Sequence, residues 1–258
     1  RQAMTTLLTD WQGRGLQFGF DRFSNPRSCD VTAPVVQDAQ LDTETTIINQ
    51  LNTAEPGGST PLYCAMTNFT SASYAPNFLD STEGSSYLLV ISDGGDYCGT
   101  GCVAGSGVDD PVLPHLGSLT RQLLDDHGVK TYAIGFGDSF QDDELTEIVN
   151  NGGTGRTTYF DAADGPALRA VFEEIAQSVV SCVYDLDDTP GAERSNVNLY
   201  FDDEVVGLDE GCANGGGWRW TDNDLLQTVE FCPGACARLQ DGVSRISATF
   251  GCPTALII

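Results

Sequence analysis

Hydrophobic positions in the first two thirds of the chain follow two periods in turn, one typical of strands and one typical of helices. The clearest strand is Tyr87–Ser92, a continuous apolar run of the kind that a parallel sheet buries on both faces. Further strands are predicted over Leu16–Phe23, Val129–Phe136 and Thr157–Phe160. Helices are predicted over Arg1–Leu8, Thr43–Asn52, a segment from Pro61, Leu116–His127, Asp142–Asn150 and Pro166–Val180. The alternation predicts an α/β fold with a doubly wound, mostly parallel sheet, and a ligand site at the carboxyl ends of its strands.

The pattern changes after Cys182, where helical periodicity ends. Short β-like runs follow, separated by Gly, Asp and Asn, and they cover Val197–Phe201, Gln227–Phe231 and Ser244–Phe250. Five of the nine cysteines belong to this part of the chain: Cys182, Cys212, Cys232, Cys236 and Cys252. We therefore predict two domains, an α/β domain over residues 1–181 and a small disulfide-rich β domain over residues 182–258.

The charge of the chain excludes one class of partner. Twelve Lys and Arg residues stand against 37 Asp and Glu residues, and the formal net charge is −25. Such a chain repels nucleic acid and anionic lipid, and suits divalent cations or basic partners. No apolar run is long enough to cross a membrane. We expect neither a nucleic-acid partner nor a membrane span.

Nine cysteines beside only two histidines favour disulfide bonds over a zinc site. Disulfides form in oxidising compartments, so we expect an exported protein, located outside the cell, on its surface or in a periplasm. The spacing of Cys98 and Cys102 predicts a local disulfide that braces the loop after the strand Tyr87–Ser92. Cys29 and Cys64 either pair with each other, or Cys64 is a buried thiol. The odd number leaves one cysteine free or paired outside the chain, and spacing does not give the pairing after residue 182.

Two short stretches carry the candidate chemistry. The strand Tyr87–Ser92 ends in Asp93-Gly94-Gly95, and the segment Gly57-Gly58-Ser59-Thr60-Pro61-Leu62 precedes a helix. Each has an ordinary structural interpretation. Thr60 would cap the helix that Pro61 opens, and Asp93 would stand where a strand enters a turn.

Together the two stretches, with Gly135-Phe136-Gly137 after the next strand, resemble the loops of a von Willebrand factor type A (VWA) domain. The resemblance covers residues 1 to about 181 and implies a bound Mg²⁺, or Ca²⁺, at the carboxyl end of the sheet. In the family this ion is held by an Asp-x-Ser-x-Ser loop after the first strand, a Thr of the second loop and an Asp of the third. Thr60 and Asp93 match the latter two by position, and Ser59 and Asp96 are candidates for residues that surround these ligands.

No Asp-x-Ser-x-Ser sequence occurs before Leu16. One interpretation is that roughly 30 residues, about one strand with its loop and the start of a helix, precede Arg1 in the natural protein. The other is that a different apolar segment occupies the place of the first strand. Thr254–Ile258 is such a segment, either within this chain or donated by a neighbouring copy.

Other candidate sites have an ordinary interpretation beside a functional one. Four acidic clusters occur. Asp142-Asp143-Glu144 is a helix start, where negative charge is stabilising. Asp109-Asp110, Asp185 with Asp187 and Asp188, and Asp202-Asp203-Glu204 are solvated turns, or one of them binds calcium. Trp218 and Trp220 are a platform for a carbohydrate or peptide, or the core of the second domain. A thiol dyad of Cys64 with His115 or His127 is not supported by spacing, and we expect no enzyme.

Two functions follow as expectations. The first is an exported, metal-ion-dependent adhesion module that binds a protein, a cell surface or matrix. The alternative is a structural subunit of a surface fibre, joined to neighbouring copies by strand exchange without a metal. The region Cys182–Thr254 resembles cysteine-rich extensions that follow the A domain in some exported bacterial proteins, which agrees with either.

Overall fold

The computed structural model describes residues 1–12, 16–22, 29, 31, 37–55, 59–70, 85–102, 112–137, 142–186, 196–221, 228–241, 243 and 245–257. The chain forms two compact units. The first unit comprises Arg1–Asp10 and Gln17–Glu173, and the second comprises Trp11–Leu16 and Glu174–Ile258. The division between the units falls within the helix α6 (Gly165–Val179). The predicted domain division after residue 181 stays a prediction.

A parallel sheet forms the centre of the first unit. Its strands are β3 (Tyr87–Ser92), β4 (Lys130–Phe136) and β5 (Phe160–Ala162), in the order β3-β4-β5. The connection from β3 to β4 contains α4 (Leu113–His127), and the connection from β4 to β5 contains α5 (Asp142–Asn151). The register of β3 and β4 runs without a shift from the pair Tyr87 and Lys130 to the pair Ser92 and Gly135.

The first unit also contains a small antiparallel sheet, made of β1 (Phe18–Phe20) and β2 (Gln37–Gln40). Here β1 is shorter than the predicted strand Leu16–Phe23, whose last residue lies outside the described part. The polar sequence of β2 gave no sign of a strand. The helices α1 (Gln2–Asp10) and α2 (Glu44–Thr53) pack together beside it, with Leu8, Ile47 and Leu51 as their shared core.

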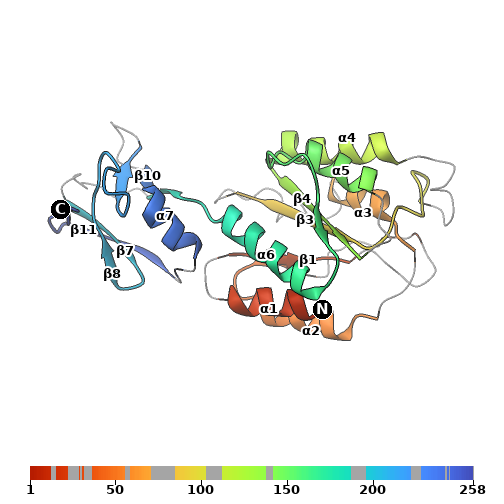
Figure 1. Cartoon of the computed structure of the whole chain (residues 1–258), viewed down its shortest axis with the longest axis horizontal. Coiled ribbons are helices and arrows are strands. Elements are labelled where there is room, and N and C mark those ends of the chain that lie inside the picture. Colours follow the sequence, from red (N-terminus) through yellow and green to blue (C-terminus); the bar gives the residue numbers. More distant parts are fainter. Residues whose placement is uncertain are drawn as a thin grey trace. The chain divides into compact units, whose positions relative to one another are not determined.

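Helices cover both faces of the parallel sheet. Figure 1 shows α4 and α5, with α3 (Leu62–Phe69), on one side of β3 and β4, and α1 and α2 on the other. The core between the sheet and the first set of helices includes Leu62, Met66, Val90, Leu116 and Ile148. The predicted α/β class, with a parallel sheet flanked by helices, is confirmed. None of the helices in the described residues is long and apolar enough to cross a membrane.

The second unit is built mainly from strands. They are β6 (Val183–Asp185), β7 (Val197–Phe201), β8 (Glu204–Val206), β9 (Trp218–Trp220), β10 (Thr228–Phe231) and β11 (Ile246–Phe250). They pair as two antiparallel sheets, β6-β10-β9 and β11-β7-β8. The helix α7 (Pro233–Gln240) overturns the expectation that helices end before Cys182. It was missed because it is short, opens with Pro and Gly, and buries only Ala235 and Leu239.

The two tryptophans of β9 belong to the core of the second unit. Trp218 is fully buried, Trp220 nearly so, and the two rings meet edge to face with centroids 5.2 Å apart. Between them Arg219 points to the opposite face, where its guanidinium bonds Glu230 of β10 at 2.6 Å. Period-two alternation therefore sends both indoles inward, and the platform interpretation is wrong.

Four disulfide bonds join eight of the nine cysteines. In the second unit, Cys182 pairs with Cys236 and Cys212 pairs with Cys232. Cys252 is exposed and has no disulfide partner, as the odd number of cysteines predicted. The other two disulfides lie beside the candidate site.

Candidate functional site

Asp93 follows β3 directly, at the carboxyl edge of the parallel sheet. The hydroxyl of the buried Ser92 donates to the carbonyl oxygen of Gly94 at 2.7 Å, which closes a tight turn around Asp93. The Asp93 side chain is exposed. The strand β3, in which only Val90 and Ser92 are buried and the other residues are half-buried, therefore ends by presenting a carboxylate to solvent at the edge where α/β sheets bind their ligands.

Thr60 lies against the same turn. The backbone N–H of Tyr97 donates to the carbonyl oxygen of Thr60 at 2.9 Å. The Thr60 hydroxyl oxygen is 3.5 Å from the position that a Cβ would take on Gly94, next to Asp93. The two predicted ligand segments are thus neighbours. Ser59 is half-buried beside Thr60 in sequence, and Gly57 and Gly58 lie outside the described residues.

Asp96 caps α3, a role that the sequence assigned to Thr60. The N-cap position is Pro61, without a side-chain hydrogen bond. Instead, the N–H of Tyr63, in the first turn of α3, donates to Asp96 Oδ2 at 2.7 Å. Asp96 Oδ1 accepts the N–H groups of Cys98 and Gly99, each at 2.7 Å. The cap predicted from local sequence was wrong because a carboxylate from the loop after β3 accepts a free N–H group of the first helical turn.

Glu144 of α5 is part of the same arrangement, although its sequence pattern indicated only a negative charge at a helix start. Its Oε2 accepts the backbone N–H of Asp96 at 2.8 Å. Burial raises the pKa of the Glu144 carboxyl above its ordinary value; the hydrogen bond from Asp96 acts in the opposite direction, and the charge of Asp96 adds to the rise. The only signal in the sequence was an acidic residue inside the run Asp142–Glu144, which any helix start could carry.

Two disulfides brace the loop that carries Asp96. Cys98 pairs with Cys29, and Cys102 pairs with Cys64 of α3. Neither the predicted Cys98–Cys102 bridge nor a Cys29–Cys64 bridge forms, and Cys64 is not a free thiol. Cys29, Cys64 and Cys98 are buried together, so each cysteine of the loop meets a partner from another segment. A thiol dyad of Cys64 with a histidine is excluded as well.

The donors at this edge suit a hard cation. Thr60 supplies a hydroxyl and Asp93 a carboxylate, whereas both oxygens of Asp96 already accept backbone N–H groups. Mg²⁺ commonly takes one or two carboxylates and keeps several waters, while Ca²⁺ takes six to eight oxygen ligands. Within the described part of the chain, no three Asp, Glu, His or Cys side chains form a group that could hold a metal ion. The residues fit an open, largely hydrated Mg²⁺ site better than a closed calcium site.

The other acidic clusters have ordinary partners where the structure describes them. Asp203 pairs with Arg245 at 3.0 Å and Glu204 with Arg238 at 2.7 Å. Asp142 accepts the Tyr159 hydroxyl at 3.0 Å, and Asp185 accepts the Thr228 hydroxyl at 2.7 Å. The cluster Asp109-Asp110 and the residues Asp187 and Asp188 lie outside the described residues.

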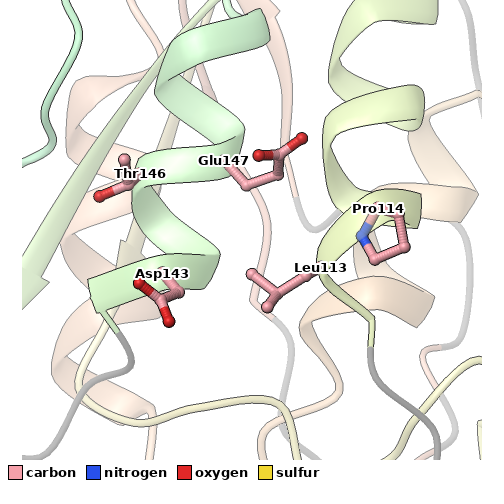
Figure 2. Close-up of a pocket in the computed structure, with 5 residues that line it drawn as sticks. All are labelled: Leu113, Pro114, Asp143, Thr146 and Glu147. Carbon is pink, nitrogen blue, oxygen red and sulfur yellow. The ribbon is translucent and has the colours of Figure 1, made fainter.

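A hollow of about 430 Å³ lies between the first turns of α4 and α5. It is lined by Leu113, Pro114, Asp143, Thr146 and Glu147, and Figure 2 shows Leu113 between the two helices with Asp143 and Glu147 on the α5 side. Neither Thr60 nor Asp93 lines it. The candidate site is therefore a surface at the end of β3, separate from this hollow.

The C-terminal segment, predicted as a filler for a missing strand, pairs within the second unit. The N–H of Leu208 donates to the carbonyl oxygen of Ala255 at 2.8 Å, and the N–H of Ile257 donates to that of Leu208 at 3.2 Å. Leu208 forms parallel bridges with Leu256 on one side and Trp218 on the other. The segment thus extends the strand pairing of its own unit.

Comparison with known proteins gave matches among solved structures alone: no family model and no curated protein matches the sequence. One is the proximal thread matrix protein 1 of the mussel byssus with a zinc-occupied MIDAS motif (16% identity, TM-score 0.45, 67% of this chain and 38% of that chain). Another structure of the same protein gives 18% identity and a TM-score of 0.43 over 70% of this chain and 44% of that one. A von Willebrand factor type A protein from Catenulispora acidiphila gives 14% identity and a TM-score of 0.43, over 96% of this chain and 50% of that one. The chain thus spans half or less of each of these structures.

Proposed function

We propose that this protein is an exported binding module whose first unit has a VWA-type fold and binds a partner through a divalent cation, Mg²⁺ in the first place. Asp93 and the Thr60 hydroxyl would hold the ion, which would supply open coordination positions for a carboxylate of a protein or surface partner. The chain's residues would bind and orient, and no bond would be broken. We therefore propose a binding role rather than a catalytic one.

The observation that carries the proposal is the meeting of two segments distant in sequence. The Tyr97 N–H bond to the Thr60 carbonyl brings the Thr60 segment to the turn that follows β3. Asp93 is exposed there, so a hydrated ion and a macromolecular partner could both reach it. Tyr97, with 49% of its surface exposed, would add an aromatic contact to the same face.

Export is supported by the disulfides. Four such bonds in one chain are typical of proteins that fold in an oxidising compartment. The acidic composition agrees with a face that attracts divalent cations. We do not propose strand exchange through the C-terminal segment, because donating it would break its pairing with Leu208.

The test is a thermal melt with Mg²⁺ and with chelator, for the wild type and Asp93→Ala. A ligand at a hundred times its Kd stabilises the folded state by about 2.7 kcal/mol, so Mg²⁺ should raise the Tm of the wild type by a few degrees. Asp93→Ala should abolish the rise. Asp126→Ala, the control, removes an equal charge at the far end of α4. This variant should still show the rise in Tm with Mg²⁺. An equal rise for Asp93→Ala and the wild type would overturn the proposal.

A further inference from the structure

We propose that Asp96 is a positioning residue of this face: its carboxylate fixes the segment that carries Asp93 against the segment that carries Thr60. The inference deepens the proposed function and rests on it for the identity of the ion.

The carboxylate of Asp96 joins two segments that are far apart in sequence. Tyr63 lies three residues after Thr60, and its N–H reaches Asp96 Oδ2 at 2.7 Å. Asp96 lies three residues after Asp93, and its Oδ1 accepts the N–H groups of Cys98 and Gly99. Hydrogen bonds to an ionised carboxylate are about twice as strong as neutral ones. One side chain therefore sets both the start of α3 and the course of the loop after β3.

A second anchor comes from the backbone of Asp96. Its N–H donates to Glu144 Oε2 at 2.8 Å, which ties the loop to the first turn of α5. The next residue, Tyr97, donates its N–H to the Thr60 carbonyl oxygen. Asp96 is thus held from α3, from α5 and from within its own loop, so that its displacement would move the turn around Asp93.

Asp96 is not placed to be a ligand itself. Three N–H donors at 2.7 Å take up two lone pairs of Oδ1 and one of Oδ2, so the carboxylate is committed mainly to the backbone rather than to an ion. Residues that hold metal ligands in place from outside change metal affinity by about 10–100-fold when they are replaced. We expect a change of this size for Asp96, without a loss of the ligands.

Asp96→Asn is the sharpest variant. The amide keeps one acceptor oxygen, for example toward Cys98 and Gly99, but turns its NH₂ group toward the N–H of Tyr63, where two donors would face each other. The chain offers a matched control in the second unit. The carboxylate of Asp209 also accepts three backbone N–H groups, from Ala213, Asn214 and Gly215, at 3.0, 2.8 and 3.2 Å, in a loop that carries a disulfide cysteine. Asp209→Asn makes the same chemical change away from Thr60 and Asp93.

Two measurements on the full chain separate the outcomes. Mg²⁺ affinity is measured by calorimetric titration, and amide hydrogen exchange is measured without metal at Tyr63, Tyr97, Cys98 and Gly99. We expect Asp96→Asn to weaken Mg²⁺ binding about tenfold and to speed exchange at these amides. Asp209→Asn should change neither. If the Asn variant does not fold, Glu144→Ala, which removes the bond to the Asp96 N–H and leaves the Asp96 carboxylate in place, should show the same effects to a smaller degree.

Each outcome decides one of the two proposals. Unchanged Mg²⁺ affinity in Asp96→Asn would overturn the role of Asp96 in positioning the Mg²⁺ ligands, whatever the exchange rates, and leave the metal site standing. A wild type that does not bind Mg²⁺ would end the proposed function. In that case the exchange data alone decide whether Asp96 joins the segment of Thr60 to the segment of Asp93. Slow exchange at Tyr63 and Tyr97 in the variant would contradict its role, and fast exchange would support it as the residue that joins the two segments.

Discussion

Cys64 in α3 and Cys102 in the loop after β3 form a disulfide, with their Cα atoms 5.8 Å apart. The bond joins the helix that begins next to Thr60 to the loop that begins at Asp93. It lies beside the Cys29–Cys98 disulfide, and the cysteines pack together in the interior. Hydrogen bonds at one end of the loop and covalent bonds at the other thus hold the two segments of the proposed face.

Replacing both Cys64 and Cys102 with Ser should destabilise the first unit by about 2–4 kcal/mol. The bond closes a segment with a sequence separation of 38, and its loss frees the unfolded chain. The free energy of unfolding in urea is the measurement. Cys252→Ser is the control, because that thiol is exposed and unpaired, and it should change the value by less than about 0.5 kcal/mol. A double variant as stable as the wild type would show that packing and Cys29–Cys98 suffice.

Glu144→Gln should remove a pH dependence from the folding stability. The pKa of Glu144 is raised by burial above its ordinary value of 4.5, so the folded state binds this proton more tightly than the unfolded state does. The contribution of Glu144 to stability is therefore greatest below pH 4.5 and decreases as the pH rises through the folded pKa. A glutamine oxygen still accepts the Asp96 N–H but carries no charge to bury. The Tm difference, variant minus wild type, should become more positive from pH 4 to pH 7; a difference independent of pH would contradict this assignment.

The elements that could be predicted are those whose signal is local. The strand Tyr87–Ser92 was placed without error, because an apolar run ends on Asp93-Gly94-Gly95. The strand β5 was placed too early, at Thr157–Phe160 instead of Phe160–Ala162, since it is short and only its first residue is a large apolar one. The polar β2 and the short α7 had no periodicity to reveal them. Length and apolar content decided which elements were found.

The candidate site was predicted only in part, for a related reason. Thr60 and Asp93 stand in recognisable loop sequences, and the structure places these loops side by side. The bonds of Asp96 join residues 33 and 48 positions apart, to Tyr63 and Glu144, and no local pattern encodes them. The disulfide pairing likewise depends on which segments the fold brings together. Whether Thr60 and Asp93 bind an ion stays a prediction.

Gly152→Ala should destabilise the first unit, because the backbone of Gly152 bonds the edge of β4. Its carbonyl oxygen accepts the N–H of Thr131 at 2.8 Å, and a Cβ on Gly152 would collide with the Thr131 carbonyl oxygen. Thr131 is fully buried in β4, so neither backbone can move aside without disturbing the sheet. Overpacking of this kind costs about 1–3 kcal/mol, to be measured as the free energy of unfolding in urea.

Gly165→Ala is the matched control, because a Cβ there meets nothing within 4 Å and α6 begins at this residue. It should leave the stability unchanged or raise it by a few tenths of a kcal/mol, up to about 1 kcal/mol. Equal stabilities for the two variants would mean that the backbones of Gly152 and Thr131 move apart at no cost, and would contradict the prediction.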